Sequence, residues 1–83
     1  MTAIMDLTKQ ALIAVSGQDV IERVTVTRGY AELSKMYPDS SVYRAQLTDS
    51  LMKLADMMEK RWPAMAWQFV QLACRQTLSQ PAA

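Results

Sequence analysis

The chain has 83 residues, which is the length of one domain, and nine basic against eight acidic side chains give a net charge of +1. The charges are spread along the chain, so no clustered basic patch for strong nucleic-acid binding is expected. The single cysteine excludes an intramolecular disulfide, and the lack of histidine removes the commonest general base and neutral metal ligand. We therefore expect a protein without catalytic activity, metal or cofactor.

Hydrophobic residues make up 51% of the sequence, which is more than one small core can absorb. Some apolar surface should therefore remain for a partner protein or a second copy of the chain. The apolar stretch near the N-terminus is interrupted by Asp6 and Lys9, is too short to span a membrane, and lacks the basic start of a signal peptide. We expect a cytoplasmic protein with no membrane contact.

Residues 3–16 form the first predicted amphipathic helix, with Thr2 as a candidate cap. Its end is predicted at Gly17, which would supply the left-handed residue that stops many helices. Met5 and Ile13 lie off the main stripe, where they either pack on a neighbouring helix or contact a second copy. The apolar stripe consists of Ile4, Leu7, Ala11 and Val15, with Leu12 beside it.

Residues 18–36 carry a mixed signal. Residues 24–27 are β-branched and alternate with period two, which suits either a strand or a helix. A lone strand would leave its backbone groups unpaired, and no second strand-like run exists. We therefore predict a helix that is bent near Gly29, with Val26, Tyr30 and Leu33 on one face, and that ends at residues 37–39 (Tyr-Pro-Asp).

Residues 40–60 show the clearest helical period, with a cap among residues 39–41. Acid-first pairs are spaced to stabilise it, from Asp49 to Lys53 and from Asp56 to Lys60. Asp56 and Glu59 could supply half of a metal site, but no other ligands complete it, so we read them as part of a solvated, charge-paired face. The apolar stripe consists of Tyr43, Leu47, Leu51, Leu54 and Met58, flanked by Val42, Ser50 and Met57.

Residues 63–78 form the last predicted helix, which Pro63 opens and which is apolar around most of its circumference. We therefore expect it to be the central helix of an all-α domain of about four helices, covering residues 1–78 with a frayed tail at 79–83. Cys74 is expected to be a buried, unreactive thiol. The predicted stripe consists of Trp67, Val70, Cys74 and Leu78, widened by Ala66, Phe69 and Ala73.

Met52, Met57 and Met58 lie in the third predicted helix, and Met65 lies near the start of the last one. Methionine fills gaps in cores and is also over-used on adaptable binding surfaces, and both interpretations stay open here. Met57 and Met58 are adjacent and cannot both lie at the middle of one stripe. At least one of them should therefore lie at an edge that a partner can cover.

Several short segments follow one another in an order that is typical of one protein family. They are Asp-Val-Ile-Glu-Arg-Val at residues 19–24, Tyr30, Tyr-Arg-Ala at residues 43–45, and Pro-Ala-Met-Ala-Trp at residues 63–67. In this order, over roughly residues 7–71, the chain resembles the Hha/YmoA family of small all-helical bacterial modulators of gene expression. The arginine-rich first helix and the Ala-Ala-Asp-His-Arg signature of that family are not kept here.

The resemblance implies a protein that docks on the nucleoid protein H-NS or a relative through acidic side chains and adjusts gene silencing. Those acidic side chains would be Glu22 and, if two residues are inserted, Asp49. The loss of the signature leaves the partner open. The alternative is a small chaperone or adaptor that holds an amphipathic helix of a secretion or assembly subunit. The surplus of apolar residues suits this role, and Met57 and Met58 would contact the partner.

Overall fold

The computed structural model describes residues 2–15 and 17–78, apart from the side chains of residues 2, 77 and 78. Its helices are α1 (Thr2–Ala14), α2 (Gln18–Met36), α3 (Ser41–Met58) and α4 (Pro63–Leu78). The predicted all-α fold is confirmed, and residues 24–27 are helical rather than extended. The cap expected at Thr2, the place of Leu78 in a stripe, and the tail at 79–83 lie outside the described residues.

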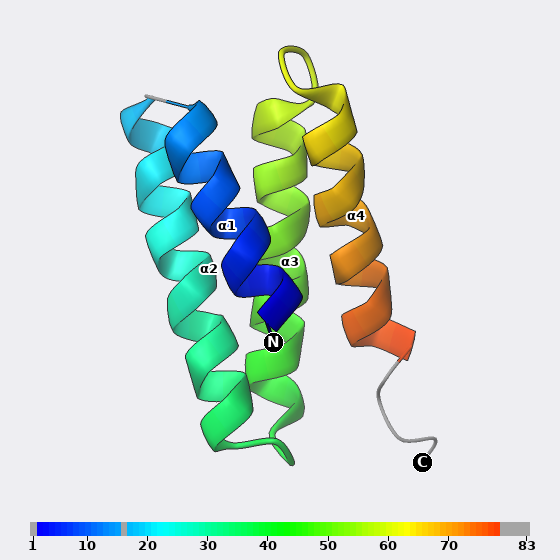
Figure 1. Cartoon of the computed structure of the whole chain (residues 1–83). Helices are drawn as coiled ribbons and strands as arrows, with labels where there is room; N and C mark the ends of the chain where they lie inside the picture. The colour runs from blue at the N-terminus through cyan, green and yellow to red at the C-terminus, as the bar shows by residue number, and fades with distance from the viewer. Residues whose placement is uncertain (1, 16, 79–83) are drawn as a thin grey trace.

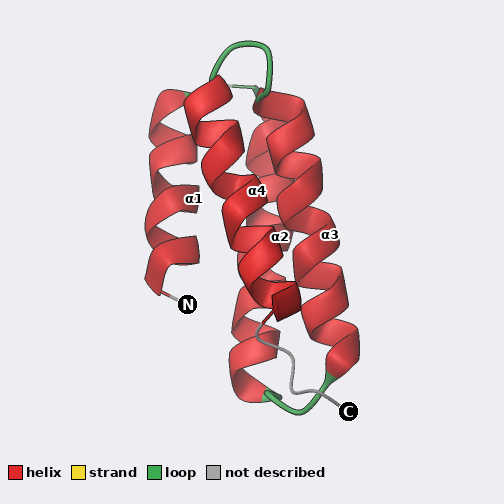
Figure 2. Ribbon diagram, turned by 90° about the vertical axis from the view of Figure 1, so that its right-hand side faces the viewer, coloured by secondary structure: helices red, strands yellow, loops and turns green. Residues whose placement is uncertain are grey.

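The four described helices run up, down, up and down along an elongated body of 39 × 19 × 18 Å (Figure 1). Each helix packs against its neighbour in the sequence, and α1 also packs against α4, so the described helices form a closed ring (Figure 2). This arrangement is that of an antiparallel four-helix bundle. The prediction that residues 63–78 form a central helix is therefore wrong, because the backbone of α4 lies beside α1 and α3 and not beside α2.

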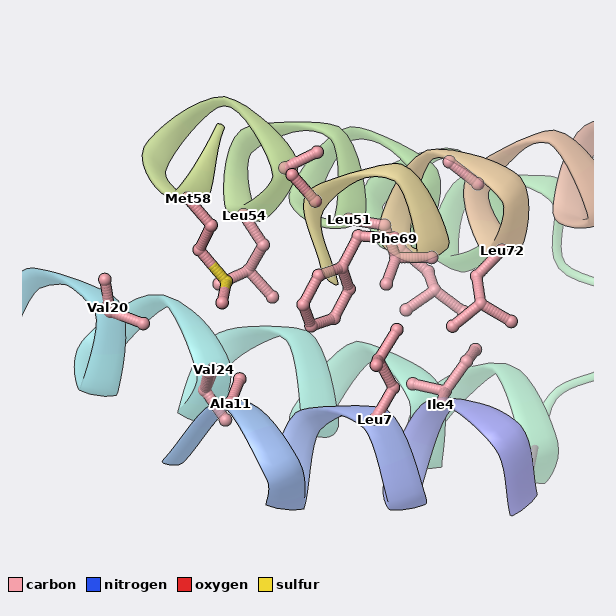
Figure 3. Close-up of a cluster of buried hydrophobic side chains, with 14 of the residues drawn as sticks. Ile4, Leu7, Ala11, Val20, Val24, Leu51, Leu54, Met58, Phe69 and Leu72 are labelled. Carbon is pink, nitrogen blue, oxygen red and sulfur yellow. The ribbon is translucent and has the colours of Figure 1, made fainter. Parts of the chain in front are cut away.

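The core is built from one stripe of each helix, and Phe69 of α4 is its largest fully buried side chain. Figure 3 shows the Phe69 ring pointing from α4 into the interior, toward Leu7 of α1. In α1 and α3 the buried stripe is the predicted one, except that Tyr43 is only half-buried. The other buried apolar residues are Ile4, Ala11, Val15, Val20, Val24, Ala31, Leu47, Leu51, Leu54, Ala55, Met58, Ala66, Leu72 and Ala73.

A pair of buried hydroxyl groups joins α2 to α3. The Oγ1 of Thr27 lies 2.6 Å from the Oγ of Ser50, and both side chains are buried. The Thr27 hydroxyl also lies 2.8 Å from the carbonyl of Arg23, which can only accept, so Thr27 donates to that carbonyl and Ser50 donates to Thr27. Both hydroxyls are thereby satisfied, and the bond fixes the register of the two helices.

This pair also explains why the predicted face of α2 is wrong. Val26 is exposed, and Tyr30 and Leu33 are only half-buried. The buried face instead includes the small residues Thr27, Ala31 and Ser34, which allow a close approach to α3. The sequence reasoning chose the larger apolar residues, whereas close helix packing favours small ones.

The connections between helices are short and are held by backbone hydrogen bonds. Gly17 is the N-cap of α2 with φ −69° and ψ 133°, and its carbonyl accepts a bond from the Ile21 N–H. The prediction of a left-handed glycine there is therefore wrong, because Gly17 begins α2 in an extended conformation. Between α2 and α3, the rings of Tyr37 and Tyr43 are 5.7 Å apart, and Arg44 donates a hydrogen bond to the Pro38 carbonyl.

The ends of α3 lie within the predicted range of 40–60. Ser40 is the N-cap residue, although its side chain makes no capping hydrogen bond. The Nζ of Lys53 lies 3.0 Å from the Oδ2 of Asp49, which confirms the first predicted ion pair. The described residues contain no ion pair between Asp56 and Lys60, so the second predicted pair is not formed; Lys60 lies in the turn at residues 59–61.

The hydroxyl pair predicts that substitutions of Thr27 and Ser50 have non-additive effects on the free energy of unfolding. Thr27→Val leaves Ser50 without its buried partner and should lower the free energy of unfolding by about 1–3 kcal/mol. Ser50→Ala leaves Thr27 bonded to the Arg23 carbonyl and should cost only about 0.5–1.5 kcal/mol. The double variant should lower the free energy of unfolding by clearly less than the sum of the two single losses, as measured by urea unfolding. Additivity within about 0.5 kcal/mol would contradict this account of the pair.

Candidate functional site

A groove lies between α3 and α4, which run side by side in both views (Figures 1 and 2). Ala55 and Ala66 are nearly buried and, because their side chains are short, they form its floor. Met52 from α3 is 45% exposed and Trp67 from α4 is 61% exposed, and these long side chains form its walls. The groove has a volume of about 290 Å³ and is lined by Met52, Ala55, Asp56, Glu59, Pro63, Ala66, Trp67 and Val70.

Helix α4 has two apolar stripes, and only one of them faces the core. The predicted stripe was right only in part: Ala66, Phe69 and Ala73 are buried as expected. Trp67 and Cys74 are exposed, contrary to the prediction, and Val70 is half-buried. Cys74 is therefore an exposed free thiol, contrary to expectation. The stripe that is buried contains Ala66, Phe69, Leu72 and Ala73, whose alanines permit close packing while Phe69 fills the interior.

The charged side chains that line the groove are both acidic. Asp56 and Glu59 are exposed, and both come from the α3 side, with Glu59 as the C-cap residue of that helix. Within residues 2–15 and 17–78, neither carboxylate takes part in an ion pair. No lysine or arginine is among the lining residues. The groove thus combines an apolar floor and walls with a negatively charged flank.

A second hollow lies between α2 and α3 and brings together two of the predicted partner residues. Glu22 and Met57, which is 40% exposed, line it with Asp19, Arg23 and Val26. The Glu22 carboxylate accepts a hydrogen bond from the side-chain amide of Gln18 at 3.4 Å. Because Arg23 lines the same hollow, the charge there is mixed.

The other two predicted partner residues lie elsewhere. Asp49 is exposed but does not line the hollow that contains Glu22, and its carboxylate is paired with Lys53. Met58 is fully buried in the core, so its prediction as a partner contact is wrong. The expectation that at least one of the adjacent methionines lies at an edge is met by Met57.

The sequence reasoning missed Trp67, Asp56 and Glu59 as members of one site. Trp67 was assigned to the core because it lies at helical spacing with Val70 and Cys74. The signal that could have found the groove is that α4 has two competing stripes, of which the one containing Phe69 has small residues for close packing.

Two further features concern chemistry and membranes. Within the described part of the chain, no three His, Cys, Asp or Glu side chains lie close enough together to hold a metal ion. None of the helices there is long and apolar enough to cross a bilayer.

No protein-family model matches the sequence, and neither the curated proteins nor the solved structures that were searched gave a match.

The two stripes of α4 predict opposite responses to substitution. Phe69→Ala should lower the free energy of unfolding by about 3–5 kcal/mol, because it empties the centre of the core. Trp67→Gln, only two residues away but on the opposite side of the helix, should change it by no more than about 0.5 kcal/mol, because the indole is mostly in solvent. Urea unfolding of both variants measures this difference, and a large loss for Trp67→Gln would place the indole in the core instead.

Proposed function

We propose that this chain is a non-catalytic protein-binding adaptor whose α3–α4 groove receives the apolar side of a partner helix. The observation that carries the proposal is the exposure of Trp67 at 61% opposite Met52 at 45%, over a floor of two alanines. Tryptophan is enriched among the residues that dominate interface energies, and methionine adapts to partners of different shape.

The free energy available from covering Trp67 supports this role. A tryptophan side chain can bury about 150–250 Å² of surface. Covering the exposed 61% of it would therefore contribute about 2–4 kcal/mol at about 25 cal/mol per Å². Met52 and the exposed part of Val70 would add to this. The groove can therefore supply a substantial share of the binding free energy of a micromolar complex.

A second candidate is the regulatory role implied by the Hha/YmoA resemblance, in which acidic side chains dock on an H-NS-like nucleoid protein. The exposure of Glu22 beside Met57 favours it. Two observations weigh against it: Arg23 lines the same hollow, and the Asp49 carboxylate is already paired with Lys53. The groove is therefore the stronger of the two candidate surfaces.

Capture of partners from a bacterial lysate with the tagged chain distinguishes the two surfaces. A partner in the groove should stay bound through a high-salt wash, because apolar contacts are not screened by salt. It should be lost from the Trp67→Gln variant and kept by Glu22→Gln. The two variants each change one exposed side chain, so each controls for the other.

The opposite pattern would replace this proposal with the regulatory one. In that case an H-NS-like protein should leave at high salt and be lost from Glu22→Gln, while Trp67→Gln retains it. A captured protein that both variants retain equally would contradict both proposals, because neither surface would then be in use.

A further inference from the structure

We propose that the occupant of the α3–α4 groove is a basic amphipathic helix with its cations along the flank that faces α3. This inference rests on the proposed function and adds the chemistry of the partner. It is carried by the position of the carboxylates of Asp56 and Glu59 on the α3 side, with Trp67 on the α4 side.

The backbone around the groove favours a helix over an extended segment. An extended peptide that binds by strand addition needs a sheet edge, and the described residues contain no strand. A groove between two antiparallel helices instead receives side chains that recur at i, i+3, i+4 and i+7 on one face of a third helix. The groove is open along α3 from Met52 to Glu59, which is about 10 Å at a rise of about 1.5 Å per residue. About two turns of a partner helix therefore fit it.

The charges select a basic partner. Asp56 and Glu59 have no ion-pair partner among the described residues, and no basic side chain lines the groove. An acidic or uncharged helix would cover these carboxylates without compensation, which costs free energy. Because the whole chain has a net charge of +1, attraction of a cationic helix has to come from these local carboxylates rather than from the overall charge.

The same charges disfavour a second copy of the chain as the occupant. A two-fold contact places the same surface of both copies face to face. The Asp56 and Glu59 carboxylates of two copies would then share one interface, and like charges there are repulsive.

Fluorescence titration with synthetic peptides tests this inference directly. The Trp62→Phe variant leaves Trp67 as the remaining tryptophan of the chain, so its emission reports on the groove. The probes are a peptide with leucines at i, i+3, i+4 and i+7 and lysines along one flank, and matched peptides with glutamine or glutamate in place of lysine. The lysine peptide should shift the Trp67 emission to the blue and protect it from acrylamide at the lowest concentration.

The charge variants supply the decisive comparison. In the Trp62→Phe background, Asp56→Asn with Glu59→Gln should weaken binding of the lysine peptide roughly 3- to 20-fold at low salt, and binding of the glutamine peptide much less. The matched control is Asp6→Asn with Glu32→Gln, which removes two exposed carboxylates from α1 and α2 and should have little effect.

The other outcomes separate the two proposals. Equal binding of the three peptides, or equal effects of the two charge variants, would overturn the basic partner and leave the groove as a binding site. A Trp67 blue shift that depends only on protein concentration would make a second copy the occupant and overturn the inference. Failure of every peptide to change Trp67 emission would overturn both the inference and the proposed function.

Discussion

A helix in a bundle of four can turn only one stripe toward the core, and this constraint decides which apolar residues of the molecule are buried and which stay exposed. Helix α4 has apolar residues for two stripes. The stripe with Phe69 is buried because Ala66 and Ala73 let the backbone approach its neighbours while the phenyl ring fills the centre. The stripe with Trp67 is consequently left beside α3 in the groove. Exposed apolar surface is thus a direct result of fitting this sequence into a closed ring of helices.

The sequence predicts the helices well because their limits depend on local signals. Pro63 begins α4 as expected, and the periodic leucines of α3 are buried as expected. The predicted face of α2 was wrong, and the predicted stripe of α4 was too wide, because it joined the exposed Trp67 to the buried Phe69. In both helices the buried face includes small residues, such as Thr27 and Ala31 of α2, that permit close packing. Which of two apolar stripes is buried depends on contacts between helices that are distant in sequence. Periodicity alone does not predict these contacts.

The candidate site was predictable only in part. The surplus of apolar residues and the expectation that Met57 or Met58 lies at an edge both pointed to a contact surface. Met57 is indeed exposed, but it lines the hollow between α2 and α3 rather than the groove. The pairing of Met52 with Trp67 across a floor of alanines depends on the register of α3 against α4, which the sequence does not state. Asp56 was missed because it was expected to pair with Lys60, an ion pair that the described residues do not contain. A groove with apolar walls and an acidic flank results from these details together.

Site-specific photo-crosslinking from the groove tests the central claim most directly. A benzophenone amino acid would replace Trp67 in one variant and the exposed Glu32 of α2 in another, and both would be irradiated in bacterial cells. If a partner binds in the groove, position 67 should give a covalent adduct to another protein and position 32 should give none. The absence of an adduct at position 67, or the same adducts from both positions, would contradict the claim that the α3–α4 groove is where a partner binds.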